Sequence, residues 1–246
     1  GLQANVRWSN TVGARESLVG WEKLTLMSVE MGPSRFAMKS NGDKITIPLI
    51  KIPFLPEGEL RLADIHCARC LQSDRHISLS AMLSPTPISS LWRITGTDGS
   101  PVEGMVETVM PGVTYHNGIM ELKGGMTVNM FDGEIRLKHL ILEDPAGLLP
   151  KLQGDISVRR INLEEVTKTY DFGRITGRID GHVKDFELVN WEPVRFDASV
   201  YSSPDDETPK RISQRAINNI SEIGGASGAL AAWYMSFLKE FRYSAI

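Results

Sequence analysis

The chain has 246 residues, which is enough to bury a sizeable core and fits one large all-β domain as well as two smaller domains. Its net charge of −3 and its scattered basic residues exclude the basic stripe of a nucleic-acid-binding surface. No window has the roughly 18 consecutive apolar residues of a membrane span, and residues 1–10 lack a signal-peptide pattern. These two absences predict a soluble chain. Because the chain begins with glycine instead of methionine, we expect it to be a fragment whose targeting or anchoring segments lie outside it.

Short alternating runs separated by turn residues fill the chain up to about residue 201. Turn pairs such as Asn41-Gly42, Asn117-Gly118 and Asp132-Gly133 recur between runs that have a side-chain period of two. This pattern is typical of a meandering antiparallel sheet. The predicted strands span residues 18–30, 34–40, 44–50, 58–67, 75–83, 91–97, 102–109, 113–121, 125–130, 133–143, 154–164, 173–188 and 193–201.

The apolar phase slips by one residue inside several of these strands. Small or apolar residues recur at positions i, i+2, i+5 and i+7, in series that start at Val19, Leu60, Ile135, Ile156 and Gly181. An extra residue in mid-strand turns the later side chains to the wrong face unless a β-bulge restores them. The slips therefore predict either bulges, which would bend the strands into a curled sheet, or a short loop at each slip.

The character of the sequence changes after residue 201. Residues 202–212 read as a polar linker, and apolar residues then recur at helical spacing. Ser213 can cap a first helix that carries Ala216, Ile217, Ile220 and Ile223 on one side. A second helix presents a wide apolar face formed by Leu230, Tyr234, Phe237, Leu238 and Phe241. We expect this face to cover the sheet as a lid, with contact to a membrane surface as the alternative.

The two cysteines form a C-x-x-C pair, Cys67 and Cys70, at the end of a predicted strand. The pair could be structural, as a disulfide or as free thiols, or a redox dithiol, or part of a zinc site with His66 and His76. A redox pair needs a helix N-terminus, and adjacent residues of a strand point to opposite faces. Both arguments favour the structural role.

No other motif in the sequence is typical of an active site. The glycine-rich stretch at residues 223–230 follows no strand and lacks the lysine of a phosphate-binding loop, and the acidic run at residues 205–207 lacks calcium-ligand spacing. The five histidines fall singly. We therefore expect no enzyme, no cofactor and no metal.

Several short motifs in the second half of the chain are more specific than those above. They are FGRI at 172–175, LVNW at 188–191, FDA at 196–198 and SQRA at 213–216. Over about residues 126–243 the chain resembles the C-terminal part of YdbH-like bacterial envelope proteins of the AsmA-like superfamily. Residues 1–125 resemble these proteins only in their general sequence character and share no specific motif with them. The resemblance implies an inner-membrane-anchored periplasmic protein that carries phospholipid between the inner and outer membranes and maintains the outer membrane.

The predicted fold is mainly β: a long curled antiparallel meander, open like a groove and with bulged strands, over residues 1–201. A polar linker at 202–212 and a two-helix segment at 213–243, packed on the sheet, follow it. The expected partner is phospholipid or another acyl-chain lipid. Candidates for lining the groove are Ile135, Leu137, Ile156, Val158, Ile175, Ile179, Val183, Val194 and Phe196. The same alternation also fits an ordinary closed-core sandwich acting as an envelope scaffold or protein-interaction module.

Overall fold

The computed structural model describes residues 2–5, 13–26, 29–54, 57–92, 102–145 and 147–223. The strands are β1 (Leu2–Asn5), β2 (Arg15–Trp21), β3 (Leu24–Leu26), β4 (Val29–Met31), β5 (Ser34–Asn41), β6 (Lys44–Pro53), β7 (Glu59–Ala68), β8 (His76–Pro87), β9 (Gly104–His116), β10 (Ile119–Met130), β11 (Gly133–Glu143), β12 (Lys151–Asn162), β13 (Arg178–Val189) and β14 (Glu192–Ser202). The helices are α1 (Ile88–Trp92), α2 (Leu163–Thr169) and α3 (Gln214–Ile223).

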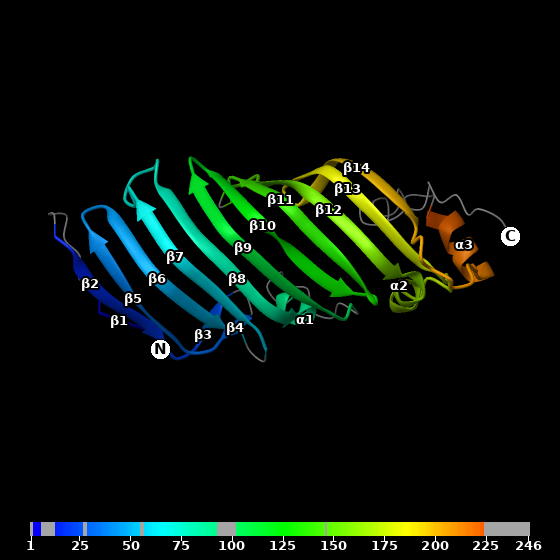
Figure 1. Cartoon of the computed structure of the whole chain (residues 1–246), viewed down its shortest axis with the longest axis horizontal. Helices are drawn as coiled ribbons and strands as arrows, with labels where there is room; N and C mark the ends of the chain where they lie inside the picture. Colours follow the sequence, from blue (N-terminus) through cyan, green and yellow to red (C-terminus); the bar gives the residue numbers. More distant parts are fainter. Residues whose placement is uncertain are drawn as a thin grey trace.

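The strands form one 12-stranded antiparallel sheet in the order β1-β2-β5-β6-β7-β8-β9-β10-β11-β12-β13-β14, and β3 and β4 make a separate two-stranded sheet. Each strand of the large sheet pairs with the strands next to it in this order, so its topology is a meander. Figure 1 shows the large sheet as a single long layer, with the strands oblique to its long axis. The predicted mainly β antiparallel fold is confirmed.

The two long edges of the sheet differ. Even-numbered strands from β6 to β14 end at the same edge, where α1 follows β8 and α2 follows β12. We call this the helix edge; in Figure 1 it is the lower edge, where α1 and α2 lie. At the opposite edge, which we call the turn edge, the described residues of the connections form no helix, and three of the connections are two-residue turns, at 42–43, 117–118 and 190–191. No helix among the described residues is long and apolar enough to cross a membrane.

Bulges occupy four of the five predicted phase slips. A residue with positive φ lies at each of the four, and the strand register shifts across each of them; these residues are Asp64, His139, Arg160 and Asp185. A residue in this conformation restores the later side chains to the original face and increases the local bend. The fifth slip, after Trp21, is a break between β2 and β3.

A small apolar cluster packs beside α2 at the helix edge of the sheet. Asn162 caps this helix, since its side chain accepts a hydrogen bond from the Glu164 N–H, and two acidic residues follow in the first turn. Leu163 of α2 packs with Ile175 and with Ala216 of α3, which is fully buried. The predicted cap of α3 is confirmed, because Ser213 Oγ accepts from the Ala216 N–H at 3.2 Å.

Some sequence predictions about the elements are wrong. The run 18–30 contains three separate strands, and residues 91–92 end helix α1 instead of starting a strand. The predicted break between 109 and 113 lies inside β9, because Pro111 is accommodated where the register between β9 and β10 shifts. Residues 163–164 belong to α2, whose cap and acidic first turn override the alternating pattern. β13 begins at residue 178, five residues later than predicted.

The predicted polar linker and the first predicted C-terminal helix differ in part from the structure. Residues 203–211 are polar, but they contact the sheet: Ser203 is buried, and Asp206 Oδ2 accepts a hydrogen bond from the Arg178 N–H at 2.7 Å. Helix α3 packs against the connection between α2 and β13, where Asn219 donates to the Phe172 carbonyl at 2.8 Å. Ile217, predicted on the apolar side, is 43% exposed. The second predicted helix lies outside the described residues.

Candidate functional site

One row of side chains crosses nine strands, from β6 to β14, on the same face of the sheet. Residues directly opposite each other on paired strands share a face, and such pairings connect each member to the next. We call this the helix-side row, because it lies nearer the helix edge. Eight interstrand spacings of about 4.8 Å make it roughly 38 Å long. Its members are Ile52, Leu60, Leu83, Thr108, Met126, Leu137, Ile156, Val183 and Ala198.

A second row runs parallel to the first and nearer the turn edge. We call it the turn-side row, and it crosses β5 to β14 through the same kind of direct pairing. Its members are Ser40, Ile45, Cys67, Ile77, Tyr115, Met120, Leu142, Leu152, Leu188 and Pro193. Nine of the ten are apolar or aromatic, or belong to a disulfide, so the face is apolar over almost the full length of the large sheet.

The bulges separate the two rows and keep them on one face. Leu137 and Leu142 of β11 are an odd number of positions apart and would point to opposite faces in a regular strand, but the bulge at His139 lies between them. Asp185 does the same between Val183 and Leu188 of β13. From β7 to β14, every strand pair has a register shift between the two rows, and we call the line of these shifts the crease.

Side chains meet across the crease at Gly154. A Cβ atom at this position would lie 2.7 Å from Leu140 Cδ2 and 3.0 Å from Phe186 Cε1. The glycine therefore lets Leu140 of β11 and Phe186 of β13 approach each other over the backbone of β12, and both are buried. Any larger residue at 154 would separate them.

The apolar face is partly buried by the sheet itself. The core cluster around Val183 consists only of residues from β8 to β14, and the side chain of Val183 is 1% exposed. On the opposite face, Val109 is 61% exposed although β9 lies in the middle of the sheet. Side chains of a single layer bury one another in this way only when the layer bends toward them, so the sheet curls around its apolar face.

Carboxylates on the opposite face bind the bulges. Asp155 of β12 accepts from the bulged Asp185 N–H on β13 at 3.0 Å and pairs with His139 Nδ1 of the bulge on β11 at 2.7 Å. Asp180 similarly accepts from the Arg160 N–H at 2.6 Å. These contacts satisfy backbone donors that the bulges remove from the ladder. The contacts of Asp155 connect three neighbouring strands at the crease, and the contact of Asp180 lies nearer the helix edge.

The contacts of Asp155 predict an acid-sensitive crease. Its hydrogen bond with His139, followed by the one from the Asp185 N–H, lowers the pKa of the Asp155 carboxyl below its ordinary value of 3.8. Because the native pKa lies below the unfolded one, the stabilisation is complete above about pH 4 and is lost as the pH falls through the native pKa. Since the group is partly exposed, we expect Asp155→Asn to cost less than about 1 kcal/mol at neutral pH.

Urea denaturation at several pH values measures this effect. The free energy of unfolding of the unmodified chain should fall more steeply below about pH 4 than that of Asp155→Asn. Glu107→Gln, on the same face of β9, is the control and should keep the steeper slope. Parallel pH profiles for Asp155→Asn and the unmodified chain would contradict this role of Asp155.

The structure brings most of the predicted groove residues together. Leu137, Ile156 and Val183 are consecutive members of the helix-side row, and Phe196 packs against the same core cluster. Ile135 and Val158 pair with each other one step closer to the helix edge on the same face, and both are half-buried. These six residues form one continuous surface.

Three predicted groove residues lie elsewhere. Ile175 precedes β13 and pairs with Ile212 in an isolated bridge. Ile175 and Ile179 both pack in the cluster beside α2. Val194 of β14 is 58% exposed. The predicted lid residues Leu230, Tyr234, Phe237, Leu238 and Phe241 lie outside the described residues.

Sequence reasoning missed four residues of the core cluster: Met110, Val113, Leu140 and Phe186. Leu140 and Phe186 belong to the phase-slip series and carried a usable signal. Met110 lies in the strand break that was predicted between residues 109 and 113, and Val113 lies at the end of that break, so neither was recognised as part of a continuous strand.

Cys67 and Cys70 are joined in a disulfide. The disulfide, one of the two forms expected for the structural role, is therefore confirmed, and the zinc and free-thiol alternatives are wrong, because a disulfide leaves no thiolate to bind a metal. Within the described part of the chain, no group of three or more His, Cys, Asp or Glu side chains is placed to hold a metal ion. His76 and His116 face each other with ring centroids 5.6 Å apart.

Replacing both cysteines with serine is expected to lower the free energy of unfolding by no more than about 2 kcal/mol, because the disulfide spans a sequence separation of only 3. Thermal and urea denaturation would measure the loss, and reduction of the unmodified chain with dithiothreitol is the matched control. The double variant should retain any lipid that the unmodified chain binds. Complete unfolding of the variant would contradict this local role.

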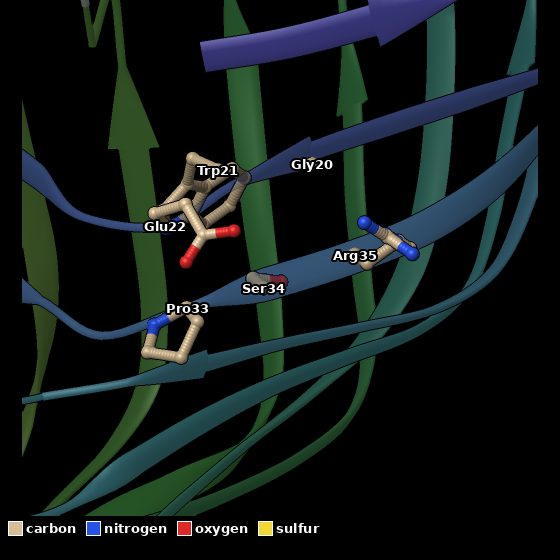
Figure 2. A pocket seen from close by; sticks show the side chains of 6 residues that line it. All are labelled: Gly20, Trp21, Glu22, Pro33, Ser34 and Arg35. Atoms are coloured by element: carbon tan, nitrogen blue, oxygen red, sulfur yellow. The ribbon is translucent and has the colours of Figure 1, made fainter. Parts of the chain in front are cut away.

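Two of the hollows in the described part of the chain are lined by residues that belong to neither row. The hollow in Figure 2, of about 250 Å³, lies where β2 and β5 adjoin, and Gly20, Trp21, Glu22, Pro33, Ser34 and Arg35 line it. It is smaller than a typical ligand pocket of roughly 300 Å³ or more. A wider one, of about 1140 Å³, lies at the helix edge and is lined by charges of both signs, some already in ion pairs such as Arg136 with Glu134. Neither resembles an active site.

No protein-family model, curated protein or solved structure matches the chain.

Proposed function

We propose that this chain is a non-enzymatic lipid-binding segment of an AsmA-like protein of the bacterial envelope, and that its curled apolar face shelters phospholipid acyl chains on their way between membranes. The observation that carries the proposal is the pair of apolar rows on one face of a single-layer sheet. The helix-side row is roughly 38 Å long at about 4.8 Å per strand. That exceeds the depth of one bilayer leaflet, which is half of about 30 Å.

The exposure of the rows favours a groove over a closed core. In a sandwich the two apolar faces bury each other, whereas the only other sheet among the described residues is the short hairpin of β3 and β4. Most members of the helix-side row, including Leu60, Met126, Leu137 and Ile156, are only half-buried. An apolar surface of this length that remains partly exposed marks a binding site.

The free energy of transferring an acyl chain from a membrane to water explains why a lipid would need such a face. Burying about sixteen methylene or methyl groups at ~0.8 kcal/mol each contributes on the order of 13 kcal/mol, so a lipid does not leave a membrane for water readily. A curled face lined by residues such as Leu137 and Ile156 replaces the water around the chain. The polar headgroup could stay in solvent beside it.

Two observations support the envelope location. The chain resembles YdbH-like proteins, which implies a periplasmic segment of an inner-membrane-anchored protein. The disulfide between Cys67 and Cys70 fits an oxidising compartment such as the periplasm, because disulfides rarely persist in the cytosol.

The test is organic extraction of the purified 246-residue chain, after expression with export to the periplasm, followed by mass spectrometry of the extract. We expect phospholipid at a ratio near one lipid or more per chain, and its displacement by a fluorescent fatty acid. A folded chain that carries no lipid and takes up no fatty acid would overturn the proposal in favour of a closed-core scaffold. A protein of similar size and export route, purified in parallel, corrects for lipid carried over from the membrane.

A further inference from the structure

The last strand of the sheet has an open edge. β14 has 11 residues and pairs with β13 along one side, and no described strand pairs with its other side. The described residues after β14 turn away from it. Asp206 binds the first backbone N–H of β13, and Arg215 of α3 forms an ion pair with Asp171 at 2.6 Å. Long open edges of this kind favour pairing with another strand.

The direction of the free backbone groups follows from one hydrogen bond. The Ser203 N–H donates to the Arg178 carbonyl at 2.9 Å, and the register between the strands is unbroken from there to Asp197. Backbone groups alternate in direction along an antiparallel strand. Odd-numbered residues here therefore bond to β13, and Phe196, Ala198 and Val200 point their N–H and C=O groups outward.

The charges on β14 select one self-pairing. Arg195 and Asp197 flank Phe196, and both are exposed on the polar face. If two copies pair antiparallel around Phe196, each Arg195 lies directly opposite the partner's Asp197, which is favourable. Pairing centred on Arg195 or on Asp197 would oppose like charges, and pairing centred on Ala198 would leave Asp197 opposite a serine.

We propose that a second copy of this chain is the occupant of this edge, with β14 antiparallel to β14 around Phe196. The two sheets then become one, and the apolar face of one copy continues into that of the other, since Phe196 packs on that face. The pairing depends only on β14 and not on bound lipid.

Sedimentation of the full chain at micromolar concentrations tests the pairing. We expect a species of twice the 27.3 kDa of one chain. Arg195→Asp and Asp197→Arg, each alone, should raise the dimer dissociation constant at least about tenfold by opposing like charges. The double variant, which exchanges the two charges, should restore the dimer. Arg35→Asp, an exposed arginine on β5, is the control and should leave the dimer unchanged.

Cysteine cross-linking tests the register. Phe196→Cys should form a linked dimer on mild oxidation, because residue 196 lies opposite itself, whereas Ala198→Cys should not. Circular dichroism verifies that each variant is folded, and any variant that is not folded is replaced by Arg195→Glu or Asp197→Lys. A chain that is monomeric at every concentration, a dimer that neither charge reversal weakens, or cross-linking through residue 198 instead of 196 would each overturn the proposal.

Discussion

Replacing Val183 with aspartate is expected to lower the free energy of unfolding by about 4 kcal/mol or more, enough to unfold a marginally stable domain. Val183 is 1% exposed and lies between Ile156 and Ala198 in the helix-side row. A carboxylate there has no cation opposite it and would be buried among apolar side chains. Urea denaturation followed by tryptophan fluorescence and circular dichroism would measure the loss.

Val109→Asp is the matched control for this experiment. Val109 has the same side chain in the middle of the same sheet, but it is 61% exposed on the opposite face, where its direct partner is Met82. The substitution should change the free energy of unfolding by about 0.5 kcal/mol or less. Similar losses from the two substitutions would contradict the curl of the sheet toward one face.

A photoreactive residue such as benzoylphenylalanine, placed at Leu137 or Ile156, is expected to form covalent lipid adducts on irradiation in the cell. These residues pair with each other in the helix-side row and are half-buried, so a bound acyl chain would pass next to them. Mass spectrometry of the purified protein would detect the adduct as an added lipid mass.

The neighbouring positions Arg136 and Ser157 provide the control, because they also pair with each other but point to the opposite face. A probe at either one should form no lipid adduct. Equal labelling from both faces would indicate contact with a membrane surface instead of a lipid held in the groove, and labelling at neither face would indicate a closed core.

The local features of this protein could be predicted from its amino-acid sequence. Alternation and turn residues predicted most of the strands from 34 to 67 and from 133 to 201, because side-chain period and turn chemistry are local properties. The phase slips predicted the bulges at Asp64, His139, Arg160 and Asp185, since a slipped series can keep one face only through an extra residue. The cap at Ser213 was predicted for the same local reason.

How these parts combine could not be predicted from the sequence, because it depends on the pairing of distant segments. Whether Leu137 meets Ile156 depends on the register between β11 and β12, and no residue pattern within one strand specifies its partner's offset. Helix α2 replaced a predicted strand end because Asn162 could cap it. The sequence left open whether Cys67 and Cys70 form a disulfide, because only the folded turn between β7 and β8 brings their sulfurs together. The rows, the crease and the open edge of β14 exist only once neighbouring strands are paired, because each is made of residues far apart in the chain.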